Sequence, residues 1–194
     1  MKYDKTAELR AKFATYGTLS EEAMDDMMKL LRPHSYAKGD YFLQEGQMAK
    51  NVAFIVKGLF SQYYASPDGD IVTKRFFPEN YFAGSLPAML THSPSMFAIR
   101  ALEPTETLEY NFYDFKSLTE KHRDLAAFYI RYMELHWIIE KEPLEISFRY
   151  DTAKTRYINF LKEYPNLEPR LKQHEIASYL GITPTQLSRI RAEM

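Results

Sequence analysis

Residues 172–194 read KQHEIASYLGITPTQLSRIRAEM, a stretch that predicts two short helices joined by a tight turn. Gly181 is placed to adopt a positive φ and to end the first helix. The second helix is predicted to begin after Thr183, with Pro184 at its first position and Gln186 completing a T-x-x-Q capping box. The first helix gains an apolar stripe for packing from Ile176, Ala177 and Leu180.

The second of these helices has two distinct sides. Leu187 and Ile190 face inward, and the opposite side carries Thr185, Ser188 and Arg189. Small hydroxyls and an arginine suit the major groove of DNA, where arginine bonds guanine with two hydrogen bonds. The pattern therefore predicts a helix-turn-helix that presents its second helix to double-stranded DNA. An ordinary α-hairpin is the alternative, and the complete helix stop and start signals disfavour it.

The composition indicates a folded protein without a global basic field. The chain has 194 residues, of which 45% are hydrophobic and 15% aromatic, and its formal net charge is −1. From Arg149 onward, eight basic side chains stand against five acidic ones, which fits contact with DNA at one end only.

The absence of cysteine excludes disulfides, thiolate zinc sites and iron–sulfur clusters, and it fits a reducing compartment. The N-terminal stretch MKYDKTAELRAKF has no apolar signal core, and no segment approaches the roughly 20 apolar residues of a membrane span. We therefore expect a cytoplasmic protein without membrane partners.

The middle of the chain, from Tyr36 to about Asn111, is β-rich and punctuated by glycines, which predicts a sandwich or roll. A helix capped by Ser20 and stopped by Pro33 precedes it. Within residues 76–95 the strand pattern breaks, and Leu86–Leu90 is expected to form a helical turn in a loop. The expected strands are Tyr41–Leu43, Val52–Val56, Leu59–Tyr64, Ile71–Phe77 and Met96–Leu102.

A long helix is predicted from about Lys116 to Glu142, and Pro143 is expected to end or kink it. One side has the 3-4-3-4 spacing of a coiled-coil seam, which indicates a dimer helix. Burial of one helix against its own sheet explains the pattern equally well, so both readings stay open. A further amphipathic helix is expected over Thr152–Tyr164. The seam consists of Leu125, Phe128, Tyr132, Leu135 and Ile139.

This order of elements resembles the CRP/FNR family of bacterial transcription regulators. The resemblance implies an α+β fold with a jelly-roll, cyclic-nucleotide-binding-like β-domain (1–115), a long dimerisation helix (116–148) and a C-terminal helix-turn-helix domain (149–194). The last domain is short, because the wing hairpin of many relatives is absent before Met194. The matching motifs are Lys38-Gly39-Asp40, Glu45-Gly46, Gly58, Asp68-Gly69 and IASYLGITPTQLSRIR over 176–191.

The family's base-reading positions fall on Thr185, Ser188 and Arg189. Many relatives carry Glu where this chain has Thr185, and threonine cannot accept from cytosine as a carboxylate does, so the operator should differ there. Gln186 completes the expected DNA-binding helix. Contacts to phosphates are expected from Thr183, Arg191, Lys172 and Arg170.

The family's phosphate-binding cassette is degenerate in this chain. Ser85 stands where relatives that bind cyclic AMP have a glutamate, and Ser95 or Met96 stands where they have an arginine. Neither residue type replaces a charge-assisted hydrogen bond to phosphate, so we expect no binding of cyclic AMP in the usual way and assign no cofactor. Arg100 is expected to point to solvent or to a carboxylate. The candidate effector pocket comprises Phe82, Gly84, Ser85, Leu86, Ser95, Met96 and Arg100.

The apolar and aromatic remainder of this pocket suits either a hydrophobic small molecule or filled core, and filled core is the favoured reading. Its members are Phe76, Phe77, Tyr81, Phe82, Met89, Met96 and Phe97.

We therefore expect a homodimeric, sequence-specific transcription regulator, with RNA polymerase and an unidentified small molecule as further candidate partners. A binding module with a vestigial helix-turn-helix is the alternative. An enzyme is not expected, since the chain has no Gly-rich phosphate loop, no G-x-S-x-G elbow and no metal motif. The histidines at 34, 92, 122, 136 and 174 lie far apart, so no metal site is expected.

Overall fold

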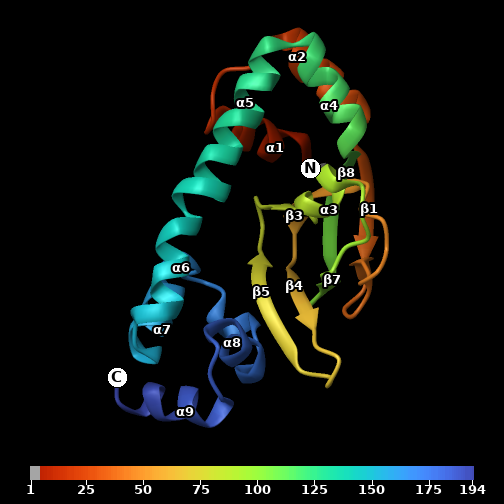
Figure 1. The fold of residues 1–194 in the computed structure, drawn as a ribbon. Coiled ribbons are helices and arrows are strands. Elements are labelled where there is room, and N and C mark those ends of the chain that lie inside the picture. The colour runs from red at the N-terminus through yellow and green to blue at the C-terminus, as the bar shows by residue number, and fades with distance from the viewer. Residues whose placement is uncertain (1–4) are drawn as a thin grey trace.

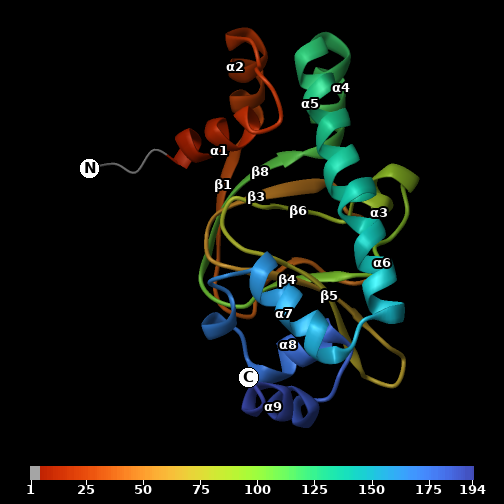
Figure 2. The same ribbon diagram turned by 90° about the vertical axis from the view of Figure 1, so that its left-hand side faces the viewer.

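The computed structural model describes residues 5–194, so the first four residues of the expected first domain and of the N-terminal stretch lie outside the described residues. Two antiparallel sheets form a β-roll, a long helix runs along one flank, and the C-terminal helices lie at the far end (Figures 1 and 2). The helices before the long one are α1 (Lys5–Ala14), α2 (Glu21–Leu30), α3 (Leu86–Thr91) and α4 (Phe112–Lys121).

Each sheet of the β-roll has four strands, ordered β1-β8-β3-β6 and β2-β7-β4-β5. The bounds of β2 and β5 agree with the expected strands, whereas β1, β6 and β8 were not predicted as separate strands. Pro33 was read as a helix stop, but it lies in the edge strand β1, where proline is tolerated. The strands are β1 (Arg32–Tyr36), β2 (Tyr41–Leu43), β3 (Asn51–Lys57), β4 (Phe60–Ala65), β5 (Ile71–Phe77), β6 (Phe82–Ala83), β7 (Ala98–Ala101) and β8 (Thr105–Asn111).

The strand β8 buries polar side chains on one of its faces. Thr107 donates a hydrogen bond to Glu109 at 2.9 Å, and Tyr36 of β1 donates to the same carboxylate at 2.6 Å. Both Thr107 and Glu109 are buried, and partners of this kind make the burial of polar groups tolerable. Residues 107–112, TLEYNF, alternate polar and apolar, so the sequence carried a strand signal that the prediction overlooked.

The long helix begins at Arg123, not near Lys116, because the chain breaks at His122, which has an extended conformation between α4 and α5. It then continues without interruption through α5 (Arg123–Met133), a π-helical segment η1 (Glu134–Ile139) and α6 (Lys141–Tyr150). Pro143 therefore does not end the helix. A wide π-turn lies directly before Pro143. The Glu140 amide donates to the Leu135 carbonyl, five residues earlier, at 2.9 Å, which is the hydrogen bond of a π-turn.

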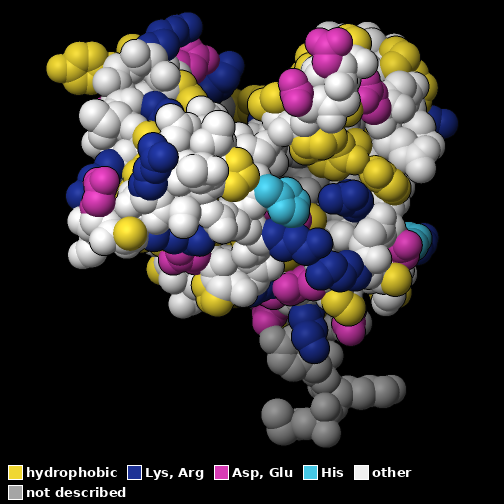
Figure 3. Space-filling view, turned by 90° about the horizontal axis from the view of Figure 1, so that it is seen from below, with side chains coloured by type: hydrophobic (Ala, Val, Ile, Leu, Met, Phe, Trp, Pro, Cys, Tyr) yellow, Lys and Arg dark blue, Asp and Glu magenta, His cyan; other side chains and the backbone are white. Residues whose placement is uncertain are grey.

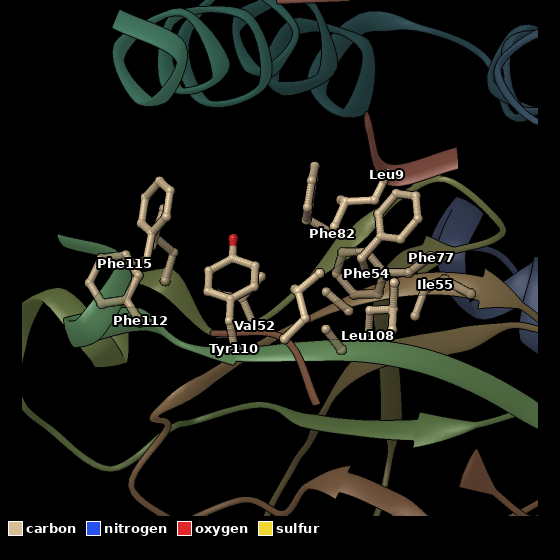
Figure 4. Packing of buried hydrophobic residues seen from close by; sticks show 14 of the residues in the cluster. Leu9, Val52, Phe54, Ile55, Phe77, Phe82, Leu108, Tyr110, Phe112 and Phe115 are labelled. Atoms are coloured by element: carbon tan, nitrogen blue, oxygen red, sulfur yellow. The ribbon is translucent and has the colours of Figure 1, made fainter. Parts of the chain in front are cut away.

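Two hydrophobic clusters stabilise the fold. The first fills the β-roll and extends to α1 and α5, and Figure 4 shows its side chains rising from the sheet toward the helices, with the Tyr110 hydroxyl pointing that way. The second joins α7 (Ala153–Glu163), α8 (Gln173–Leu180) and α9 (Pro184–Ala192) to the outside of the roll, where it includes Leu59, Phe76 and Leu102. A short 3-10 helix η2 (Glu168–Arg170) links α7 to α8.

Gly58, between β3 and β4, has no room for a side chain. Its φ is +101°, and an added Cβ would lie 2.5 Å from Thr105 Oγ1. We expect Gly58→Ala to lower the free energy of unfolding by about 1–2 kcal/mol more than Gly69→Ala does. Gly69 is the matched control, because its φ is +89° but nothing lies within 4 Å of an added Cβ. Equal losses in urea unfolding would contradict the role of the close approach.

Candidate functional site

The helices α8 and α9 form a compact pair whose turn is set by local signals. Gly181 ends α8 in the left-handed conformation, with φ 66° and ψ 38°. Thr183 Oγ1 accepts from the Gln186 amide at 3.2 Å, and Gln186 Oε1 accepts from the Thr183 amide at 3.0 Å. Leu187 and Ile190 are buried against the second cluster. The bounds of both helices agree with the two helices expected from the sequence.

The outer side of α9 is free for a partner. The side chains of Thr185, Ser188 and Arg189 are all exposed, as is Gln186. Lys172, at the start of α8, is exposed too. The structure thus gathers the expected base-reading residues and one expected phosphate contact on accessible surface at the end of the molecule.

Arg191, an expected phosphate contact, is held inside the domain. Its Nη2 atom lies 2.7 Å from Glu168 Oε1, and its Nε donates to the Tyr157 hydroxyl at 3.1 Å. Tyr157 also donates to Glu168, so the three groups form one network. In this structure a carboxylate binds the Arg191 guanidinium, and the expected phosphate contact stays a prediction.

Arg170 is likewise engaged, in a clamp between the C-terminal helices and the β-roll. Its guanidinium lies 2.8 Å from Glu79 Oε2 and 2.6 Å from Glu103 Oε1, and it donates to the Gly58 carbonyl at 3.0 Å. Burial alone would raise the pKa of Glu79. Hydrogen bonds from Arg170 and from backbone amides, including that of Gly58, outweigh burial and lower this pKa. In this structure two carboxylates hold Arg170, and its expected contact with a DNA phosphate stays a prediction.

A second contact joins α8 to the edge strand β5. Ser178 Oγ accepts from the Thr73 amide at 2.8 Å and donates to the Ile71 carbonyl at 2.6 Å, so it satisfies backbone groups that the sheet edge leaves unpaired. Phe76, on the same strand, packs against Phe160, Tyr164 and Tyr179 of the C-terminal helices. The strand β5 thus connects the β-roll to the C-terminal helices through direct contacts.

Charge on this end of the molecule is mixed. Figure 3, which looks at the molecule from below, shows lysine and arginine side chains interspersed with acidic ones and no continuous basic field. This agrees with the net charge of −1. Electrostatic attraction to a polyanion would therefore come from a few exposed groups such as Lys172 and Arg189.

In the degenerate phosphate-binding cassette, two serine hydroxyls are hydrogen-bonded to each other. Ser95 Oγ donates to Ser85 Oγ at 2.9 Å, and both residues are buried. The Phe97 amide donates to Ser95 Oγ at 3.1 Å, which completes a local network with no charged member. Met96 is 58% exposed, and Arg100 on the outer side of β7 lies over the Tyr63 ring at 5.6 Å. Ser85, Ser95, Met96 and Arg100 are therefore not brought together around a ligand space.

A cavity of about 750 Å³ lies instead between the β-roll, the long helix and the C-terminal helices. Of the expected pocket residues, it is lined by Phe82, Gly84 and Leu86, together with Phe77, Tyr81 and Met89. Phe76 points to the other side of its strand. Phe77, Phe82 and Met89 are themselves buried in the first cluster, so the cavity lies beside a filled core, and binding of a small molecule there stays a prediction.

Two basic side chains in this cavity were missed by the sequence reading. Lys74 is the extra residue of a β-bulge, since Gln62 pairs with Arg75 while Tyr63 pairs with Thr73. The bulge directs both Lys74 and Arg75 to the cavity. In the sequence both residues belong to the expected strand Ile71–Phe77, and nothing in the KRFF segment marks them as cavity residues.

Glu140 of the long helix faces these cations. Its Oε2 atom lies 3.8 Å from Arg75 Nη2 and 2.6 Å from His136 Nδ1. Burial, and then repulsion from Arg75 and Lys141, lowers the pKa of Lys74 to about 8. The ion pair with Arg75 is long, so the two adjacent cations are only partly compensated.

The expected seam of the long helix divides in the structure. Leu125 and Phe128 are buried, 0% and 5% exposed, and Phe128 stacks against Phe13 of α1 at 4.3 Å. As inner residues of one chain they cannot form a dimer seam, and the coiled-coil reading is wrong for them. Tyr132 and Leu135 are half-buried, and Ile139 is exposed. The π-turn explains the break, because it shifts the helical phase by one residue after Met133.

A different apolar face of the long helix is exposed. Ile130 and Ile138 are 57% and 62% exposed, and positions eight apart across a π-turn lie over each other as positions seven apart do in an α-helix. Further exposed apolar side chains on the same helix are Ile139, Leu144, Ile146, Phe148 and Tyr150.

One cluster among the described residues has metal-ligand geometry, namely Glu22, Asp26 and His122. Lys121 Nζ already lies 2.6 Å from Asp26 and 3.3 Å from Glu22, so an ammonium group fills the position of a cation. The cluster ties α2 to α4. None of the described helices is long and apolar enough to cross a membrane.

Comparison with known proteins places this architecture. Residues 33–122 match the family described as cyclic nucleotide-binding domain. The whole fold is similar to FixK2 from Bradyrhizobium japonicum (17% identity, TM-score 0.71, 84% of this chain and 83% of that one). It is also similar to the c-di-GMP responsive global regulator CLP from Xanthomonas campestris, with 12% identity and a TM-score of 0.68 over 90% of this chain and 91% of that one.

The catabolite activator protein from Thermus thermophilus has a TM-score of 0.57 at 16% identity, over 92% of this chain and 84% of that one. No curated protein sequence matches the chain. At these identities the solved structures establish the fold alone. Residues 33–122 thus match the cyclic nucleotide-binding domain, within a fold similar to those of these bacterial regulators.

Proposed function

We propose that the chain is a homodimeric, sequence-specific DNA-binding transcription regulator of the CRP/FNR type. The observation that carries the proposal is the outer side of α9, where Thr185, Ser188 and Arg189 are exposed while Leu187 and Ile190 anchor the helix from behind. A helix held in this way presents its N-terminal half to the major groove. The fold shared with regulators supports the same conclusion.

The dimer would form through the exposed face of the long helix. An apolar surface that includes Ile130 and Ile138 is costly in water, and a second copy of the same helix offers the matching surface. Two copies of α9 would then enter successive major grooves about 34 Å apart on a roughly palindromic site. RNA polymerase is a candidate partner once the dimer is bound.

The function is tested by selecting bound sequences from a random DNA pool and titrating the winners with salt. Enrichment of a palindrome with half-sites one helical turn apart is the expected result. No enriched motif in any effector condition, together with a shallow salt slope, would favour the binding module with a vestigial helix pair.

Arg189 is expected to read a base. We expect Arg189→Ala to cost about 1–3 kcal/mol of operator affinity and to relax one base position. Lys172→Ala is the comparison, since a phosphate contact should weaken operator and random DNA alike. Equal losses on operator and random DNA for Arg189→Ala would remove Arg189 from the reading set.

A further inference from the structure

The cavity between the β-roll and the long helix has the size and the walls of a binding site for a small organic molecule. Its volume of about 750 Å³ lies within the roughly 300–1,000 Å³ of small-molecule sites. Aromatic rings line it from three parts of the chain: Phe77 from β5, Tyr132 and Trp137 from the long helix, and Tyr179 from α8. These walls favour a ligand with an apolar or aromatic body.

The charge of the lining favours an anion with a single negative charge. Three carboxylates, those of Glu140, Glu145 and Glu163, stand against four basic groups and leave a net charge of +1. Three of the seven groups have partners within the lining, because Lys141 lies 3.4 Å from Glu145 and Glu163 accepts from Tyr179 at 3.0 Å. The basic groups are Lys74, Arg75, Lys141 and Arg156.

Lys74 and Arg75 are the groups best placed to hold that anion. Arg156 is partly engaged, because its Nε and Nη1 donate to the backbone carbonyls of Leu180 and Asp151 at 3.0 and 2.7 Å. Lys74 Nζ has aromatic neighbours, with the Phe97 ring at 4.2 Å and the Trp137 ring at 5.5 Å. Arg75 has the long ion pair of 3.8 Å to Glu140, and its guanidinium lies over the Phe77 and Tyr81 rings at 5.8 and 5.9 Å.

We propose that this cavity binds an amphipathic organic monocarboxylate, with its carboxylate against Lys74 and Arg75 and its apolar body among the aromatic rings. The buried Ser85–Ser95 pair offers no charged group, so the cations of β5 and not the cassette would hold the anion. The proposal names the effector class of the proposed regulator. It rests on the proposed function only for its consequence for DNA binding.

The consequence follows from the position of the two cations on β5. Arg75 lines the cavity, while its neighbours Phe76 and Thr73 contact the C-terminal helices from the same strand. A ligand that shifts the β-bulge at Lys74 or displaces Glu140 would therefore change the contacts between β5 and α8. The affinity for DNA would change with them.

The test uses 1-naphthoate as the probe and needs no DNA. Trp137 is the only tryptophan of the chain and lines the cavity, so its fluorescence reports binding directly. We expect saturable binding with one site per chain, by fluorescence and calorimetry, and at least tenfold weaker binding of the neutral 1-naphthamide. Cyclic AMP at the same concentration should not displace the probe. Absence of saturable binding, equal affinity for the amide, or displacement by cyclic AMP would overturn the proposal.

Variants locate the site. Lys74→Gln and Arg75→Gln should each weaken 1-naphthoate at least tenfold, and Arg75→Lys should retain part of the affinity. Lys57→Gln is the matched control, since Lys57 is an exposed cation at the end of β3 and outside the cavity. Unchanged affinity in both glutamine variants would overturn the assignment. Because selection from random DNA is measured separately, either proposal can fail while the other stands.

Discussion

Ile138→Glu should convert the protein from dimer to monomer and lower its operator affinity at least 100-fold. Ile138 is 62% exposed on the long helix, and the substitution would place a charge at the centre of the proposed interface. Burying an unpaired carboxylate costs far more than the few kcal/mol that a helix-pair contact contributes. Losing the partner also removes one of two half-site contacts, so operator binding falls with dimerisation.

The measurement is analytical ultracentrifugation beside operator titration. Ser117→Glu is the control, because it adds the same charge to an exposed helical position on α4, outside the long helix. Leu125→Ala is a second comparison. Leu125 is 0% exposed, so its truncation should lower the free energy of unfolding by about 2–5 kcal/mol and leave the folded protein dimeric. A dimeric Ile138→Glu protein with unchanged operator affinity would exclude this face as the interface.

Local sequence signals predicted the parts of the fold whose cause is local. The capping box of Thr183 and Gln186, the turn at Gly181 and the β-rich run Ile71–Phe77 each depend on a few neighbouring residues. Their bounds could therefore be predicted from sequence.

Features that depend on distant partners could not be predicted in this way. The π-turn at Glu134–Ile139 alters the helical phase, and β8 buries Glu109 because Tyr36, 73 residues away, binds it. The roles of Arg170 and Arg75 also depend on residues that are distant in the sequence. A lone arginine near a basic C-terminal segment suggests phosphate binding, and only the fold shows that two carboxylates of the β-roll already hold Arg170.

Arg170→Met should lower the free energy of unfolding by about 2–3 kcal/mol at neutral pH. Breaking a buried ion pair costs about 3–5 kcal/mol, and this arginine side chain is 26% exposed, which reduces the loss. Lys172 lies two residues further along the chain and is exposed. Lys172→Met should therefore leave the free energy of unfolding unchanged, but it should weaken DNA binding and reduce the salt slope by about one.

The pH dependence separates the clamp from a phosphate contact at Arg170. Because Arg170 and backbone amides outweigh burial and hold the pKa of Glu79 below its ordinary value, the clamp stabilises the fold above about pH 4.5. The contribution is lost as the pH falls through the lowered pKa, so the difference between wild type and Arg170→Met should shrink below about pH 4. Urea unfolding at several pH values measures this directly. A variant with unchanged stability and a reduced salt slope would instead assign Arg170 to the DNA phosphates, and would require the C-terminal helices to leave the β-roll on binding.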